Sequence, residues 1–193
     1  EGYRIVLTSP WARRVIFAAF VESAAMFGAL TYVGAYLHSR FDVSFTLVGL
    51  FVAAFAIGGL LYSLSVRALV PRLGQIGLSR TGGFLLCGSF LLLAVTPLYG
   101  LAPLATAGVG LGFYMLHNTL QTNATQMAPE ARGTALGAFS SALYLGQTLG
   151  VALNSAIFDR FGAAPVFLIS AVLLLALGLW FARALRQRAT IPI

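Results

Sequence analysis

The sequence contains no lysine, a single cysteine and very little charge: Asp, Glu, Lys and Arg together make up 9% of its 193 residues. The lone Cys87 excludes an intrachain disulfide and lies inside an apolar run. So little charge, combined with 59% hydrophobic residues and a mean hydropathy of +0.90, excludes an ordinary soluble domain. We therefore expect an all-α membrane protein.

Histidine and acidic residues are scarce as well. The only histidines, His38 and His117, have no cysteine near them, so we expect neither a metal site of the usual ligand types nor a cofactor. The twelve basic residues are all arginines and outnumber five acids, for a net charge of +7. Because these arginines flank apolar runs, we interpret them as topology signals and expect no nucleic-acid partner. Attraction to anionic lipid is the alternative interpretation.

Prolines and short polar segments divide the chain into six apolar runs. Each run is near or above the ~20 residues needed to cross the hydrocarbon core. The connections are too short for a soluble domain, so residues 1–193 are predicted to form a single six-helix transmembrane domain. The predicted spans are 12–36, 44–66, 76–96, 101–126, 134–157 and 164–184.

The distribution of the arginines predicts on which side of the membrane the two ends of the chain lie. With six spans in order, ten arginines fall on one face and only two, Arg40 and Arg160, on the other. The positive-inside rule then predicts that both termini are cytoplasmic. Because the chain opens on Glu1 with no signal-like segment, we interpret it as a piece of a longer protein.

The most polar membrane stretch runs from 114 to 154 and carries two stripes at helical spacing. Polar side chains at hydrocarbon depth usually face a bundle interior or a water-filled cavity. We therefore expect both stripes to face one shared wet space. The first stripe comprises Tyr114, His117, Asn118, Gln121 and Thr125; the second comprises Ser140, Tyr144, Gln147 and Asn154.

Two loop motifs carry a family resemblance. The run PEARGTALGAFSSALYLGQTLG (129–150) resembles the loop and helix between the tenth and eleventh spans of major facilitator superfamily transporters, particularly bacterial efflux members. Arg132 and Gly133 supply the Arg-Gly step of that loop. The segment VRALVPRLGQ resembles the family's cytoplasmic motif, Gly-x-x-x-Asp-Arg-x-Gly-Arg-Arg, with Arg72 and Gly74 matching Arg-x-Gly. Pro71 replaces the aspartate, and DRFG at 159–162 is a further familiar element.

The resemblance implies the C-terminal half of a twelve-helix transporter, built as two inverted three-helix repeats in a bacterial inner membrane. It implies secondary active transport by alternating access. Because the resemblance is to efflux members, export of a drug or metabolite is favoured over nutrient uptake. Half of such a fold lacks one wall of the cavity. We therefore expect it to pair with the N-terminal half or with a second copy of itself, and the cytoplasmic residues Arg72, Gly74, Arg132 and Gly133 are candidate gating positions.

Aromatic and amide side chains suit a small organic solute, since aromatics give apolar contact and amides orient a ligand. The candidate substrate-binding residues are Tyr32, Tyr114, His117, Asn118, Gln121, Tyr144, Gln147 and Asn154. Tyr36 is expected to be an interfacial anchor. Glu22, the only acid within a span, is the candidate proton-coupling residue. The alternative is a structural carboxyl whose hydrogen bond comes from His117 or Asn118.

Two other classes of function were compared with transport. An intramembrane serine protease would need a base within reach of Ser140 or Ser141 and a setting such as Gly-x-Ser-x-Gly, which the sequence lacks. An enzyme is therefore not expected. A non-transporting scaffold or receptor subunit on the same fold stays open, and stabilisation of the protein by a solute would distinguish transport from it.

Overall fold

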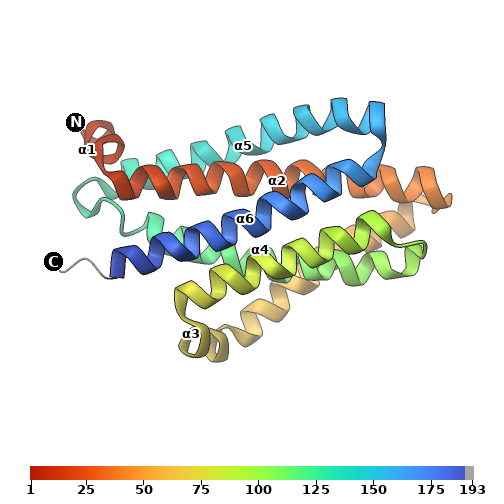
Figure 1. The fold of residues 1–193 in the computed structure, drawn as a ribbon, viewed down its shortest axis with the longest axis horizontal. Coiled ribbons are helices and arrows are strands. Elements are labelled where there is room, and N and C mark those ends of the chain that lie inside the picture. Colours follow the sequence, from red (N-terminus) through yellow and green to blue (C-terminus); the bar gives the residue numbers. More distant parts are fainter. Residues whose placement is uncertain (190–193) are drawn as a thin grey trace.

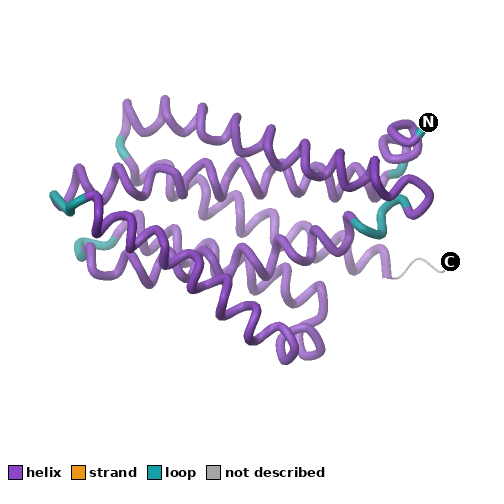
Figure 2. The backbone as a smooth tube through the Cα atoms, turned by 180° about the vertical axis from the view of Figure 1, so that it is seen from behind, coloured by secondary structure: helices purple, strands orange, loops and turns teal. Residues whose placement is uncertain are grey.

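The computed structural model describes residues 1–189, which are almost entirely helical (Figures 1 and 2). Five helices, α2 to α6, are long and apolar enough to cross a membrane, which confirms the all-α membrane class. The elements in order are α1 (Gly2–Thr8), α2 (Pro10–Phe41), α3 (Phe45–Val95), the 3-10 turn η1 (Tyr99–Leu101), α4 (Ala102–Ala124), the 3-10 turn η2 (Pro129–Ala131), α5 (Arg132–Phe161) and α6 (Ala163–Ala189).

Helix α3 is 51 residues long, which at a rise of about 1.5 Å per residue would give a rod of about 76 Å. The chain avoids such a rod by turning back at Gly74, whose φ of 58° and ψ of −177° lie outside helical space. A positive φ favours glycine because a Cβ would be strained there. The runs predicted at 44–66 and 76–96 thus belong to two arms of one element, residues 45–73 and 75–95 (Figure 1).

The helices extend past the predicted spans, and α1 was not predicted at all. α2 begins after Ser9, whose hydroxyl accepts a hydrogen bond from the Ala12 amide at 3.3 Å, and continues to Phe41 instead of ending at 36. Its last turns are held by Arg40, which donates to the Tyr36 hydroxyl at 3.0 Å. Tyr36 is only 4% exposed, so the expectation of an interfacial anchor was wrong: this side chain packs within the bundle.

Close backbone approaches hold the helices in two pairs, α2 with α5 and the arms of α3 with α4. A Cβ added at Gly58 of α3 would meet the Ala107 carbonyl of α4, and one added at Gly110 of α4 would meet the Phe55 carbonyl. Small residues permit such contact between membrane helices. α6 covers the second arm of α3, where Ser79 donates to the Gly178 carbonyl at 2.9 Å.

Both described ends of the chain lie at the same end of the bundle (Figure 1). The bend at Gly74 and the connection between α4 and α5 also lie there, together with ten of the twelve arginines. We call this the arginine-rich end. The connections from α2 to α3, α3 to α4 and α5 to α6 lie at the opposite end, where Arg40 and Arg160 are found.

Candidate functional site

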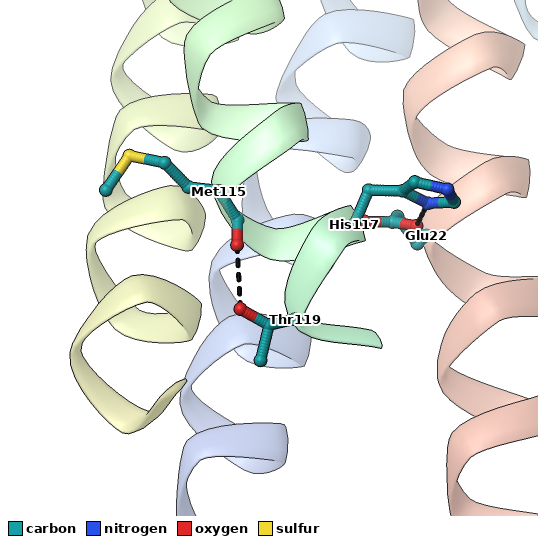
Figure 3. A network of polar contacts seen from close by, with 4 residues as sticks. All are labelled: Glu22, Met115, His117 and Thr119. Carbon is teal, nitrogen blue, oxygen red and sulfur yellow. Dashed lines mark hydrogen bonds and ion pairs between the residues drawn. The ribbon is translucent and has the colours of Figure 1, made fainter. Parts of the chain in front are cut away.

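A carboxyl and an imidazole meet inside the bundle, between α2 and α4 (Figure 3). Glu22 has no exposed surface, and its Oε2 lies 2.8 Å from Nδ1 of His117, whose side chain is 15% exposed. A contact of this length needs a proton between the two atoms, carried either by the imidazole or by the carboxyl. The second carboxyl oxygen, Oε1, is buried and has no hydrogen-bond partner among the described residues.

The sequence around Glu22 explains why a polar group can be buried there. The inward face of α2 carries Ala18, Ala25 and Ala29 on the turns before and after Glu22, and all three are buried. Alanines leave room for an imidazole to reach across from α4. The sequence left His117 and Asn118 as possible partners of Glu22. In the structure the partner is His117, whereas Asn118 lines a cleft between α3 and α4.

Aromatic rings enclose the imidazole. The His117 ring stacks on Phe113, with centroids 4.7 Å apart and planes at 19°, and Phe139 of α5 lies 5.9 Å from it. Phe27 of α2 packs edge-on against Phe113 at 5.4 Å. These rings remove water from most of the pair, so access is confined to the exposed part of the imidazole. Such a setting strengthens electrostatic interactions between the two groups.

A cleft of about 460 Å³ lies between α4 and both arms of α3, on the side of the bend at Gly74. Its volume falls within the range of small-molecule sites. The structure brings two predicted amides, Asn118 and Gln121, into this cleft, along with Thr125 of the same stripe. The lining residues are Tyr62, Val66, Val70, Gln75, Leu78, Asn118, Thr119, Gln121, Thr122 and Thr125.

Tyr114 links this cleft to the buried pair. Its ring stacks on Tyr62, which lines the cleft, at 6.4 Å, and meets Phe113 edge-on at 5.4 Å. Phe113 in turn lies against His117. A continuous row of rings therefore joins the cleft to the imidazole. Tyr62 was not among the predicted residues, because its position four residues before the loop motif VRALVPRLGQ gave no chemical signal.

A hydrogen bond between two amides joins α4 to α3 beside the cleft. Asn123 donates from Nδ2 to Oε1 of Gln75 at 2.7 Å, and also to the Thr119 carbonyl at 2.8 Å. Gln75 occupies a position where the family motif has a basic residue. Neither amide was predicted as a site residue, because their meeting depends on the reversal of α3.

The predicted residues of the second stripe lie elsewhere. Asn154 is buried beside a separate cavity of about 290 Å³ between α2, α5 and α6. Gln147 is half-buried, and Ser140 and Tyr144 are exposed, Tyr144 to 71%. α4 and α5 meet at few points, so the two stripes do not face one shared cavity within residues 1–189.

The remaining predicted residues have these positions. Tyr32 donates to the Val151 carbonyl at 2.8 Å and so ties α2 to α5. The loop residues Arg72, Gly74, Arg132 and Gly133 are all exposed at the arginine-rich end. Within residues 1–189 no three His, Cys, Asp or Glu side chains gather to hold a metal ion.

Comparison with known proteins assigns the family. The model of the Major Facilitator Superfamily matches residues 1–151, well over half of the chain. The chain belongs to this superfamily. An uncharacterized transporter of the superfamily from Bacillus subtilis (strain 168), YceJ, is 24% identical over 171 residues, covering 86% of this chain and 43% of that protein. The chain thus spans less than half the length of this relative, and no solved structure matches it significantly. Membership points to transmembrane transport rather than catalysis.

Proposed function

We propose that this chain is the C-terminal half of a superfamily transporter, with six spans arranged as two inverted three-helix repeats. α3 supplies two of these spans, because each arm is about as long as the ~30 Å hydrocarbon core requires and Gly74 separates them. The match to 43% of the relative's length supports the assignment to one half. The arginine-rich end then faces the cytoplasm of a bacterium, with both ends of the chain on that side of the inner membrane.

The proposed activity is proton-coupled export of a small organic solute by alternating access. The observation that carries it is the buried contact between Glu22 and His117. Two titratable groups that share a contact inside a membrane bundle form a natural proton relay, since ionisable residues at this depth are rare unless they serve a pathway. Their contact joins α2 to α4, so its protonation state bears on how these helices pack.

The substrate surface is proposed to include the cleft residues Asn118 and Gln121 with Tyr114 above them. Tyr32, His117, Tyr144, Gln147 and Asn154 extend it across α2, α4 and α5. The 71% exposure of Tyr144 supports a cavity whose opposite wall lies outside this chain. That wall is proposed to be the N-terminal half or a second copy, with the exposed Arg72, Gly74, Arg132 and Gly133 gating its cytoplasmic side.

Proton coupling is tested with the complete transporter in proteoliposomes under an imposed pH gradient. Glu22→Gln keeps the side-chain shape and hydrogen-bonding capacity but cannot titrate. The variant is expected to bind substrate and to equilibrate it without uphill export. Asp42→Asn is the matched control: Asp42 ends α2 in the left-handed conformation that Asn tolerates, and its export should be unchanged. Normal uphill export by Glu22→Gln would contradict the coupling role.

The substrate surface is tested by binding measurements on the same protein. Gln121→Ala removes an amide from the cleft and Gln147→Ala removes one from α5, and each is expected to weaken binding about 5- to 15-fold if it makes one hydrogen bond of ~1–1.5 kcal/mol. Gln126→Ala, an exposed position outside the cleft, is the control. Unchanged affinity in both test variants would remove these residues from the site.

The missing wall is tested with the chain alone. Without a partner it is expected to give no substrate flux in proteoliposomes, because the polar surface has no opposite side. A chain that stays monomeric in the membrane and still transports would contradict the proposal.

A further inference from the structure

A groove of about 520 Å³ runs along the bundle between α1, α2 and α5, away from the cleft and the buried pair. Its walls are apolar except for the hydroxyl of Ser141 and for Arg13 and Tyr3. The lining residues are Tyr3, Leu7, Arg13, Ile16, Phe17, Phe20, Ala138, Ser141, Ala142 and Leu145. Phe20 also lines the cavity between α2, α5 and α6, so the two hollows are neighbours along α2.

The exposed residues on either side of the groove form a largely apolar surface. On α5, Leu145, Leu149 and Leu153 are exposed on the groove side, whereas the exposed Tyr144 is one position, or about 100°, around the helix. On α6, the exposed positions of the same face are Leu168, Ile169, Val172, Leu173 and Trp180. Apart from the hydroxyls of Ser141 and Thr148, these exposed side chains are apolar, and a membrane face of this kind suits acyl chains better than a solute pathway.

The headgroup level is marked by aromatic residues. Phe17 packs edge-on against Trp180 of α6 with centroids 5.8 Å apart. Tryptophan is enriched where the hydrocarbon meets the headgroups. Arg13 lies one helical turn beyond Phe17, about 6 Å toward the arginine-rich end, which is the direction in which lipid phosphates are expected if Trp180 marks the interface.

The charge of Arg13 is available to a ligand. Its guanidinium makes no ion pair and no hydrogen bond with the described part of the chain, in which the one ion pair joins Glu22 and His117. No acidic side chain lines the groove. A largely apolar trough with an unpaired cation matches a molecule with an acyl chain and an anionic head.

We propose that this groove is a binding site for an anionic phospholipid. One acyl chain lies against Ile16, Phe20 and Ala138, and the phosphate meets Arg13 with the Tyr3 hydroxyl beside it. From Arg13 to Ala25, the far limit of the neighbouring cavity, α2 rises about 18 Å, which is close to one leaflet of a ~30 Å hydrocarbon core. The groove and the neighbouring cavity follow one another along α2 over that length.

The proposal is tested by native mass spectrometry of the complete transporter, titrated with dioleoyl phosphatidylglycerol and dioleoyl phosphatidylcholine. Wild type is expected to retain phosphatidylglycerol preferentially. Arg13→Gln is expected to reduce that preference about fivefold, the contribution of one arginine near an anionic surface. Arg14→Gln is the matched control: Arg14 is the next residue, is equally exposed and does not line the groove, so the preference should stay unchanged.

Two further measurements distinguish binding of a lipid in the groove from diffuse surface attraction and from binding of a phosphate group alone. Ala138→Phe fills the groove and is expected to lower retention of both lipids, whereas glycerol phosphate in large excess should not displace phosphatidylglycerol because it has no acyl chain. Equal losses for Arg13→Gln and Arg14→Gln would indicate diffuse surface attraction and overturn the site. Unchanged preference in Arg13→Gln, or full displacement by glycerol phosphate, would overturn it as well. None of these outcomes depends on transport activity.

Discussion

Replacing His117 with phenylalanine isolates the energetic contribution of the buried pair. The new ring can keep the stacking on Phe113 at about the same place, but both carboxyl oxygens of Glu22 then lack a partner, since Oε1 already has none. A buried polar group left without its hydrogen bond costs about 1–3 kcal/mol. For a chain of this size that corresponds to a fall in melting temperature of about 2–12 °C.

A second substitution tests whether that loss comes from the carboxyl. Glu22→Met replaces it with a flexible apolar side chain that fits irregular space. Because replacing both partners with apolar groups is nearly neutral, the double variant is expected to recover most of the lost stability. It should still fail to drive uphill export. Thermal unfolding of the purified protein and proteoliposome transport measure the two effects separately.

The matched control is His38→Phe, at the opposite end of the bundle. His38 contacts the Val43 carbonyl at 2.9 Å and stacks on Phe45, so its loss should cost only one ordinary hydrogen bond, about 0.5–1.5 kcal/mol. If His117→Phe is as stable as wild type, or if Glu22→Met fails to restore the double variant, Glu22 and His117 do not form the pair described and the reasoning is refuted.

The remaining predictions concern packing and the cleft. Gly146→Ala is expected to lower the melting temperature, because the new Cβ would press on a carbonyl of α2 and overpacking costs about 1–3 kcal/mol. Gly137→Ala, which faces open space on the same helix, should be neutral or stabilising in the same thermal assay. Gln75→Ala removes the bond from Asn123 and should speed amide hydrogen exchange around the bend of α3. Equal exchange in this variant and in Gln126→Ala would contradict that role.

The membrane helices could be predicted from the length of the apolar runs, because only a lipid bilayer accommodates apolar stretches of that length. The partner of Glu22 could be narrowed to two neighbours from the sequence, since His117 and Asn118 were the polar groups expected at similar depth. Choosing between them required knowing how α4 is rotated about its own axis. The sequence does not say which of two adjacent helical residues faces α2. The structure selects His117.

The cleft was only half predictable. Asn118 and Gln121 follow from helical spacing, but the contact between Gln75 and Asn123 joins residues 48 apart and exists only because α3 reverses at Gly74. Within residues 1–189 the two stripes do not line one cavity, because α4 and α5 make few contacts with each other. A space completed by a partner outside this chain stays a prediction. Close packing of α5 instead goes to α2, where glycines allow backbone contact.

The pairing of helices has a mechanical consequence. α2 with α5 forms one stiff body and α3 with α4 another, because each pair is interlocked through backbone contacts at glycines that resist sliding. Among the described residues, one side-chain hydrogen bond crosses from the first body to the second, and it is the contact between Glu22 and His117. This contact is the polar link across the seam between the bodies, beside the apolar packing of α6 on both α2 and α3 and of Phe27 on Phe113. Under the proposed proton coupling, its protonation would change how tightly the two helix pairs hold together.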